Sequence, residues 1–399
     1  MSDKKLQWVK MMNDDFVTSA LRSTFYRKKL AGLTINRWED IPFTTKDELR
    51  NTSAYDVLGA SIEDIATYHE TSGTTGTPTP SWYSHSDVIK EYQVILQSKL
   101  NLNKNDILLN RFPFALAIPS FILYWACQKV GATHIGVDKA SMITPDRRVV
   151  EIMQRAKPSI LALLPSEAEK IFEVAKQLHI PFPTDGLRAL LLAGELVSPK
   201  RKEYFEKLWG VPVFTFFGST ETGGLFVSDQ DGYYRLNNPH VKIEVVDDDG
   251  HPVPHGVRGY GVLSTTREGM PLLRYYNHDL LEIRDADPTN KDQTPALIHY
   301  GRDENTIIWH GKEWTFYDLQ ELIYSLDRVP LLWKVKQNGE AVTFILQYTP
   351  DQNISSDLIK NEIFRRSDLE AEVRIEDIIP IEKLIGKPAY SKYVHIEKV

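Results

Sequence analysis

The sequence predicts an α/β protein: a large N-terminal domain of mixed sheets flanked by helices, with a small antiparallel β region, and then a small α+β domain. Three observations predict it. Short β-rich runs alternate with helical patterns between residues 132 and 217, which favours a mostly parallel sheet covered by helices. From about residue 225, short strands alternate with turns. The chain has 399 residues, more than one ordinary domain contains.

The N-terminal part of the chain contributes helices first. Residues 5–30 carry apolar side chains near one helical face. The stretch 41–49 predicts a loop that enters a helix, with Thr44 or Thr45 as the N-cap. Further helices are expected at 86–100 and 117–130.

The predicted parallel sheet comes from the middle of the chain. Its β-rich runs are expected at 132–137, 159–164, 188–193 and 211–217. Helical patterns separate them at 146–156, 166–178 and 199–209. Ligands of α/β proteins bind at the carboxyl ends of parallel strands, so the residues that follow these runs are the first candidates for a site.

The C-terminal part of the chain has a different pattern of secondary structure. Antiparallel strands are expected at 225–229, 233–237, 241–250, 260–266, 271–277 and 280–285, before a polar loop that reaches residue 294. The tail beyond Gly301 has helical patterns near 317–326 and 355–366 and β patterns near 332–337 and 341–348. We therefore place the domains at 1–302 and 303–399, with one continuous domain as the alternative.

Composition excludes several classes of protein. Lys and Arg total 47 and Asp and Glu total 54, a net charge of −7 without a basic tract, so no nucleic-acid partner is expected. The single cysteine, Cys127, indicates a reducing compartment. The apolar stretch 112–127 is shorter than the roughly 20 residues of a membrane helix, and the N-terminus does not read as a signal peptide. We expect a cytoplasmic enzyme without a membrane partner and leave its oligomeric state open.

A loop rich in glycine and threonine follows the apolar run at 65–68. Glycines allow its backbone to turn and to approach a ligand closely, and consecutive N–H groups in such a loop can bind phosphates. The loop reads Thr71-Ser72-Gly73-Thr74-Thr75-Gly76-Thr77-Pro78-Thr79-Pro80. It lacks the Gly-Lys-Ser/Thr ending of a P-loop nucleotide hydrolase. A surface turn is the alternative.

A second glycine-rich segment, from Phe216 to Gly224, follows the run at 211–217. Its carboxylate, Glu221, can hold Mg²⁺ against a nucleotide phosphate; a turn with a solvated glutamate is the alternative. Three more segments follow in order, and each alone is an ordinary surface feature. They are Leu273 to Leu280, Gly301 to Asn305, and Gly386-Lys387.

Together, the order and spacing of these segments resemble the acyl-adenylate-forming enzymes, above all their phenylacetate–CoA ligase branch. Five stretches carry the resemblance: TSGTTGTPTP for the phosphate loop, FFGSTETGG for the Tyr-Gly-x-Thr-Glu motif, MPLLRYYNHDL for the Pro-Leu-x-Arg-Tyr segment, GRDEN for the hinge, and PFTTKDELR. The resemblance covers nearly the whole chain. It implies a large adenylate-forming domain and a small, mobile C-terminal domain.

The resemblance implies ATP and Mg²⁺ as cofactors and assigns roles by position. Lys387 would bridge the acid's carboxylate and the α-phosphate, Glu221 would bind Mg²⁺, and Thr220 would lie near the α-phosphate. Asp279 would accept hydrogen bonds from the ribose hydroxyls, and Glu304 would be the hinge. The other implied nucleotide-binding residues are Thr71, Ser72, Gly73, Thr74, Thr75, Gly76, Gly194, Glu195, Phe217, Gly218 and Arg302.

Departures from the family's pattern bear on these roles. Glu304 stands where relatives usually have Asp or Lys, although a polar hinge can still rotate. Residues 388–390 read Pro-Ala-Tyr, where a basic residue usually follows Lys387, so Lys383 and Lys392 are the alternatives. No histidine stands in the aromatic run 112–121, so the resemblance implies no histidine role there.

The resemblance also places the acid between the run 112–121, the turn 193–195 and the strand end 214–219. The lining residues would be Phe112, Phe114, Ala115, Ile118, Pro119, Ser120, Thr215, Phe216, Phe217 and Ser219. Flat aromatic walls with a few hydroxyls suit a ring-bearing acid; core packing is the alternative. We expect an aromatic acid such as the 3,4-dihydroxybenzoate of petrobactin siderophore assembly, with a carrier-protein phosphopantetheine thiol as acceptor.

Other functions are alternatives. An aryl-CoA ligase of the phenylacetate type shares the first half-reaction and differs in its thiol. A nucleotide-binding module without catalysis is the alternative from another class. A metal site at His251 and His255 is disfavoured by the Pro-Val-Pro between them. Neither a Gly-x-Ser-x-Gly elbow nor a complete Rossmann glycine pattern is present in the sequence.

Overall fold

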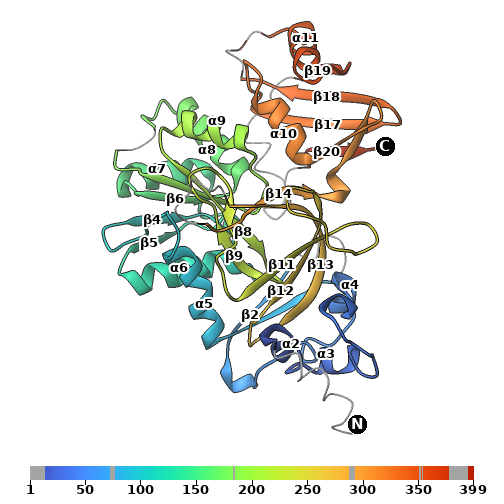
Figure 1. Ribbon diagram of the computed structural model, residues 1–399. Coiled ribbons are helices and arrows are strands. Elements are labelled where there is room, and N and C mark those ends of the chain that lie inside the picture. Colours follow the sequence, from blue (N-terminus) through green and yellow to red (C-terminus); the bar gives the residue numbers. More distant parts are fainter. Residues whose placement is uncertain are drawn as a thin grey trace.

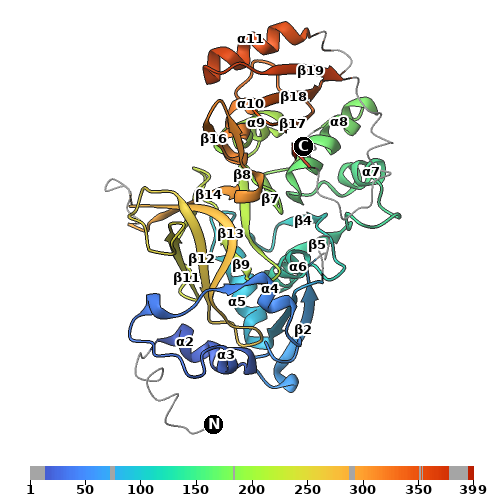
Figure 2. The ribbon, with the colours of Figure 1, turned by 90° about the vertical axis from the view of Figure 1, so that its right-hand side faces the viewer.

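The computed structural model describes residues 14–71, 77–182, 185–286, 293–349, 352, 354–376 and 394–399. Figure 1 shows a helix-covered sheet, a second sheet of long curved strands beside it, and the C-terminal part above both. In Figure 2, turned by 90°, the short N-terminal helices lie at the end of the molecule opposite the C-terminal part.

The helix-covered sheet has the strand order β5-β4-β6-β7-β8-β9 and is parallel except for β9. All residues of β6 and β7 are buried, as expected for a parallel sheet covered on both faces. Helices α5 and α6 pack on one face and α7, α8 and α9 on the other. The strands are β4 Ile107–Asn110, β5 Thr133–Gly136, β6 Ile160–Leu163, β7 Ala189–Ala193, β8 Val213–Ser219 and β9 Gly223–Val227; the helices are α5 His85–Leu96, α6 Ile118–Val130, α7 Asp146–Ala156, α8 Pro165–Gln177 and α9 Pro199–Trp209.

The second sheet is antiparallel, in the order β10-β14-β13-β12-β11, and the short β1 pairs with β13 in parallel. The expected strands 271–277 and 280–285 are in fact the single strand β13, Leu272–Arg284. Asn277 and His278 give the sequence a turn-like interruption, and the structure has a shift in strand register there, with His278 at a φ of +64°. Because β12 pairs with β13 on both sides of the shift, the two halves remain one strand. The other strands are β1 Thr44–Thr45, β10 Tyr234–Arg235, β11 Val241–Val246, β12 Gly259–Thr265 and β14 Ala296–Arg302.

The helix expected at 5–30 is wrong in its length. Within the described residues the chain forms two short helices, α2 Asp15–Ala20 and α3 Thr24–Lys29. Helix α3 starts afresh because the Ser23 hydroxyl accepts the Tyr26 N–H as its N-cap. The N-cap at Thr45 is confirmed by a capping box with Glu48 in α4, Lys46–Arg50. Strands β2, Ile65–Glu70, and β3, Pro80–Ser84, then pair as an antiparallel ribbon.

The C-terminal part has a sheet in the order β19-β18-β17-β20 and an apolar core around Trp309, Trp333 and Phe344. The domain boundary at 302/303 stays a prediction. None of the helices in the described ranges is long and apolar enough to cross a bilayer. The elements are β15 Ile307–Trp309, β16 Lys312–Trp314, α10 Phe316–Tyr324, β17 Leu332–Asn338, β18 Ala341–Gln347, α11 Ser356–Ser367, β19 Glu372–Glu376 and β20 Ile396–Lys398.

A buried charged cluster joins the C-terminal part to α8 and α9. Arg201, on α9, is fully buried, and its guanidinium lies 3.3 Å from the carboxylate of Glu169 and 3.6 Å from that of Glu195. Tyr324, on α10, donates to Glu169 at 2.6 Å and places its ring against Arg201. Gln320, also on α10, adds two hydrogen bonds to the backbone before α9. Charge as well as apolar contact therefore holds α10 in place.

This cluster generates a stability prediction. Arg201→Met removes the cation that two buried carboxylates face, and such a loss costs roughly 3–5 kcal/mol. Lys200→Met is the matched control on the same helix, because Lys200 pairs with the exposed Glu203 and surface pairs contribute about 1 kcal/mol or less. Urea unfolding of the wild type and both variants measures the two losses. Equal unfolding midpoints for the variants would contradict the role given to Arg201.

Candidate active site

Glu221 lies in the turn between β8 and β9, at the carboxyl end of a parallel strand, and is buried. Lys46 Nζ lies 2.9 Å from Glu221 Oε1, and the Tyr275 hydroxyl donates to the same oxygen at 3.4 Å. Burial raises the pKa of Glu221, but the charge and hydrogen bond of Lys46 more than offset this and lower the pKa overall. The carboxylate is therefore ionised at neutral pH and can attract a cation.

Backbone pairing brings Lys46 to this turn. Strand β1 pairs with β13, so Thr44 lies opposite Tyr275 and Thr45 lies opposite Tyr276. Lys46 follows as the first residue of α4, from where its side chain reaches Glu221. The sequence alone assigns Lys46 no role, because only the pairing of β1 with β13 brings Lys46 close to Glu221.

Arg267 fixes the backbone of the same turn. Its guanidinium donates to the carbonyl oxygen of Glu221 at 2.7 Å, to that of Trp82 at 2.6 Å, and to the Ser81 hydroxyl at 2.9 Å. It also lies 3.8 Å from the centroid of the Tyr83 ring. One buried side chain thereby joins Glu221 to β3, the strand that follows the glycine- and threonine-rich loop. No signal in the sequence singles out Arg267.

The turn enters β9 at a position that requires glycine. Gly223 has a φ of +79°, and a Cβ there would lie 2.1 Å from Glu91 Oε1. Burial raises the pKa of Glu91 to about 8, so this carboxyl is protonated at neutral pH, and its other oxygen accepts the Gly224 N–H at 2.6 Å. The turn and α5 therefore meet without room for another side chain.

A second buried carboxylate, Asp279, lies on β13 opposite Arg302 of β14. It accepts a hydrogen bond from Asn277 Nδ2 at 2.5 Å, while His299 Nε2 lies 3.4 Å and Arg302 Nε 3.6 Å away. Burial raises the pKa of Asp279, but His299 and Arg302 lower it more. The ring of Phe217, on β8, lies 5.0 Å from that of His299, so β8 adjoins this carboxylate as well.

The two carboxylates belong to one site. Burial lowers the pKa of Arg302, but the charges of Asp279, Glu304 and Glu221 more than offset this and raise it. Tyr275, which donates to Glu221, lies on the same strand as Asp279. The structure thus brings together three residues that the sequence separates widely: Glu221, Asp279 and Arg302.

The glycine- and threonine-rich loop begins at the end of β2 and returns at β3. Its ends are joined, because the Thr71 hydroxyl accepts the Thr79 N–H at 2.9 Å and the Thr79 carbonyl accepts the Thr71 N–H at 3.2 Å. Several predicted residues lie outside the described part of the chain. They are Ser72, Gly73, Thr74, Thr75 and Gly76 of this loop, and Lys387 with its alternatives Lys383 and Lys392.

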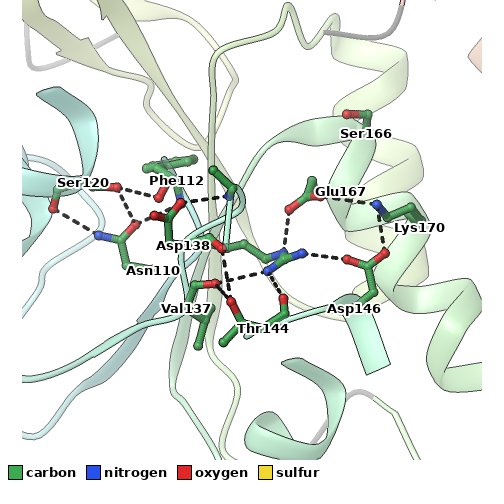
Figure 3. Close-up of polar contacts among 12 residues, drawn as sticks. Asn110, Phe112, Ser120, Val137, Asp138, Thr144, Asp146, Ser166, Glu167 and Lys170 are labelled. Atoms are coloured by element: carbon green, nitrogen blue, oxygen red, sulfur yellow. Dashed lines mark hydrogen bonds and ion pairs between the residues drawn. The ribbon is translucent and has the colours of Figure 1, made fainter. Parts of the chain in front are cut away.

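The expected acid-binding loop connects β4 to α6. Phe112 is buried, Phe114 is half-buried and Ala115 is exposed. The buried Ser120 hydroxyl donates to the Phe112 carbonyl at 2.7 Å, and the Asn110 side chain accepts the Phe112 N–H at 3.1 Å (Figure 3). Ser120 therefore shapes the loop in this structure, and its contact with an acid stays a prediction.

A cluster of buried charges fixes the start of this loop. The Arg111 guanidinium lies 2.7 Å from Asp146 and 2.7 Å from Glu167, and Lys170 lies 2.8 Å from Asp146. Figure 3 shows Asp146, Glu167 and Lys170 facing one another, with Asp146 at the start of α7 and the other two on α8. The sequence gives no sign of this cluster, which ties the beginning of the loop to two helices.

The other predicted site residues lie in separate settings. Ser219 shares a hydroxyl hydrogen bond with Thr222, and the carbonyl of Thr220 accepts the Tyr83 hydroxyl. Glu195 accepts two hydrogen bonds from Ser166, close to Arg201. The exposed Glu304 lies 3.7 Å from Arg302. Ile118 and Phe216 are buried. Gly194 has a φ of +85°, and Gly218 lies against the carbonyl of Gly223. Their contacts with substrates stay predictions.

Magnesium carried by a nucleotide fits Glu221. Among the residues that the structure describes, no group of three or more His, Cys, Asp or Glu side chains could hold a metal ion. Mg²⁺ in nucleotide enzymes uses one or two carboxylates together with substrate phosphates, and Glu221 supplies one ionised carboxylate. Lys46, which pairs with the same oxygen, would share that contact.

Comparison with known proteins gives a family match over most of the chain. The model of the AMP-binding enzyme family matches residues 21–268. The phenylacetate-coenzyme A ligase of Thermus thermophilus is 28% identical over 283 residues, which cover 68% of this chain and 62% of that ligase. The p-hydroxybenzoic acid–AMP ligase FadD22 of Mycobacterium tuberculosis is 28% identical over 213 residues, 51% of this chain and 29% of FadD22. The matches thus span less than two thirds of either relative.

A solved ligase shares the fold over the whole chain. The 2-hydroxyisobutyryl-CoA ligase in its postadenylation state, with R3-HIB-AMP, has a TM-score of 0.83 at 16% identity and covers 100% of this chain and 89% of its own. Its open conformation has a TM-score of 0.67 at 16% identity, and the match covers 99% of this chain and 91% of the ligase. These values confirm the expected fold of mixed sheets with flanking helices.

The turn at Gly223 generates a prediction. Gly223→Ala forces a side chain into a positive φ and against Glu91, so we expect a loss of more than about 3 kcal/mol of unfolding free energy. Gly210→Ala is the control, because Gly210 also has a positive φ of +67° but nothing within 4 Å of a Cβ, and should lose about 1–2 kcal/mol. Urea unfolding measures both losses. Similar losses would show that Glu91 does not restrict this turn.

Proposed function

Because the chain belongs to the AMP-binding enzyme family, we propose that it is an acid–thiol ligase that works through an acyl-adenylate. ATP and an aromatic carboxylic acid give acyl-AMP and pyrophosphate, and a thiol then takes the acyl group. One observation carries the proposal. Glu221, Asp279 and Arg302 share a site that Arg267 joins to the strand leaving the Thr71–Thr79 loop.

The first step requires two anions to meet. A carboxylate oxygen of the acid attacks the α-phosphorus of ATP, the bond from that phosphorus to pyrophosphate breaks, and acyl-AMP forms. Glu221 holds Mg²⁺, which supplies neutralising charge to the phosphates. The N–H and hydroxyl groups of residues 71–76 bind the same phosphates, and Asp279 accepts the ribose hydroxyls. Holding the reactants in line supplies much of the rate.

The C-terminal domain, residues 303–399, completes the site in this proposal. Lys387 binds the charge that develops between the acid and the α-phosphate. Rotation about Glu304 then withdraws Lys387 and admits the thiol. The thiol sulfur attacks the acyl carbon, AMP leaves with the bonding electron pair, and the thiol proton passes to solvent. Such a rotation must break the contacts of Tyr324 with Glu169 and Arg201.

An aromatic acid suits the loop between β4 and α6 together with β8, because Phe112 of the loop and Phe216 of β8 belong to one apolar cluster. Phe112, Phe114 and Phe216 supply aromatic rings, and the relatives described above are named for phenylacetate and p-hydroxybenzoic acid. The 3,4-dihydroxybenzoate of petrobactin assembly is a narrower choice that these names do not favour. We therefore propose a phenylacetate- or benzoate-like acid.

CoA is the thiol acceptor that the relatives favour over the expected carrier protein. The T. thermophilus relative is named as a coenzyme A ligase, and the solved ligase with the same fold is also named for CoA. A carrier-protein thiol is the second candidate, because FadD22 is named for the acid–AMP step alone. The buried free thiol of Cys127 suits a reducing compartment, so we place the reaction in the cytoplasm.

The proposal is tested by acid-dependent exchange between ATP and labelled pyrophosphate. We expect exchange with aromatic acids that exceeds exchange with aliphatic acids by at least about 10-fold, because a fitting apolar pocket discriminates by about 1–3 kcal/mol. Addition of CoA should then yield the acyl-CoA thioester, detected by mass spectrometry. Exchange with no acid, beside measurable ATP binding, would contradict ligase activity and favour the non-catalytic module. Exchange without a CoA product would favour a carrier protein.

Asp279 generates a second prediction. Asp279→Asn removes the charge that accepts the ribose hydroxyls, so the KM for ATP should rise about 10-fold, as expected for the loss of a charge-assisted hydrogen bond. Asp285→Asn is the control, because the side chain of Asp285 is 83% exposed and pairs with His255. Steady-state exchange kinetics give both KM values. An unchanged KM for ATP in Asp279→Asn would contradict the proposal that Asp279 binds the ribose hydroxyls.

A further inference from the structure

His69 connects the two loops that the proposed reaction must align. It lies on β2, two positions before Thr71, and is 1% exposed. Its ring packs edge-on against Tyr83 and Phe121, with centroids 5.4 Å and 5.2 Å away. Phe121 in turn packs against Phe114 of the loop between β4 and α6. The ring of His69 therefore lies where β2, α6 and this loop meet.

Two polar contacts fix the ring of His69. Nδ1 lies 3.2 Å from the carbonyl oxygen of Leu116, and Nε2 lies 3.1 Å from the Thr67 hydroxyl. Burial lowers the pKa of His69 to about 4, so the ring is neutral at neutral pH and carries one proton. A carbonyl oxygen can only accept. Nδ1 therefore carries the proton and donates to Leu116, while Nε2 accepts from Thr67.

The acceptor, Leu116, has a backbone that needs support. Its φ is +56°, a conformation that costs a non-glycine residue about 1–3 kcal/mol and persists where surrounding contacts hold it. The Leu116 carbonyl also accepts the Glu70 N–H at 3.2 Å, while the Leu116 side chain is half exposed. Two donors from neighbouring residues of β2 thus hold the far end of a loop whose start is held by Arg111.

We propose that His69 is a positioning residue for the acid: its Nδ1–H bond to Leu116 sets the acid-binding loop against the start of the phosphate loop. This inference rests on the proposed function. Two consecutive residues, His69 and Glu70, hold the acid-binding loop through Leu116. The next residue, Thr71, begins the phosphate loop. The reacting carboxylate and α-phosphorus must approach to about 3–3.5 Å, so the relative position of these loops governs how the acid is held.

Two substitutions separate the hydrogen bond from the packing of the ring. His69→Phe keeps an aromatic ring but removes the donor to Leu116. His69→Asn gives up the ring but can place its side-chain N–H near the position of Nδ1. We expect His69→Phe to raise the KM for the acid about 5- to 10-fold, as the loss of one hydrogen bond predicts, with the KM for ATP changed less than about 2-fold. His69→Asn should recover most of the acid KM.

Thr67→Val is the matched control, because it removes the other contact of the ring and leaves the bond to Leu116. Its acid KM should stay within about 2-fold of the wild type. Equal increases of the acid and ATP KM values in His69→Phe would overturn the proposal, because general loosening of the site produces that result. Failure of His69→Asn to recover the acid KM would overturn it too.

Hydrogen exchange measured by mass spectrometry tests the same bond without activity. His69→Phe should speed amide exchange in residues 112–118 about 5-fold, with residues 160–163 of β6 as the internal reference. Unchanged exchange in residues 112–118 would overturn the inference whatever the kinetics show. Absence of pyrophosphate exchange in the wild type would overturn the proposed function, while the amide exchange still decides whether His69 holds the loop.

Discussion

The candidate site depends on the buried guanidinium of Arg267. It donates to the carbonyl of Glu221 on one side and to β3, through Ser81 and Trp82, on the other. Strand β3 carries the returning end of the Thr71–Thr79 loop, and the Glu221 turn ends a strand of the parallel sheet. In the proposed reaction, the loop binds phosphates and Glu221 binds a metal ion, and both can act on one nucleotide only if the distance between them is fixed. Arg267 fixes it through the backbone and leaves the Glu221 side chain free for Lys46.

In the proposed reaction, the same site has to receive an anion beside carboxylates of its own. Each of its buried carboxylates has a cationic neighbour: Lys46 beside Glu221, and Arg302 beside Asp279. Both neighbours lower the pKa of their carboxylate, so the carboxylates stay ionised without repelling a polyanion strongly. Charge pairing also holds the surrounding structure, since Arg111 anchors the acid-binding loop and Arg201 anchors the contact with α10. Buried arginines thus set the geometry at three places around the site.

Much of the fold could be predicted from the sequence, because apolar runs such as those of β6 and β7 predict buried parallel strands. Strand β4, Ile107–Asn110, was missed, although β5 and β6 have the same length and were predicted. The motifs predicted Glu221, Asp279 and Arg302. They could not predict Lys46, Arg267, His299 or His69, because these side chains reach the site through strand pairings and contacts between distant segments. Two predictions from local sequence were wrong. The polar residues within β13 suggested two strands, and the apolar pattern at 5–30 gave no sign of the helix break capped by Ser23.

The central claim is that acid and nucleotide occupy adjoining parts of one site. The most direct measurement is the equilibrium affinity of a stable acyl-AMP analogue, phenylacetyl sulfamoyl adenosine, compared with the affinities of AMP and phenylacetate alone. The account predicts that the analogue binds at least about 100-fold more tightly than AMP, because one molecule contacts both parts of the site and resembles the intermediate. An analogue that binds no more tightly than AMP would contradict the account.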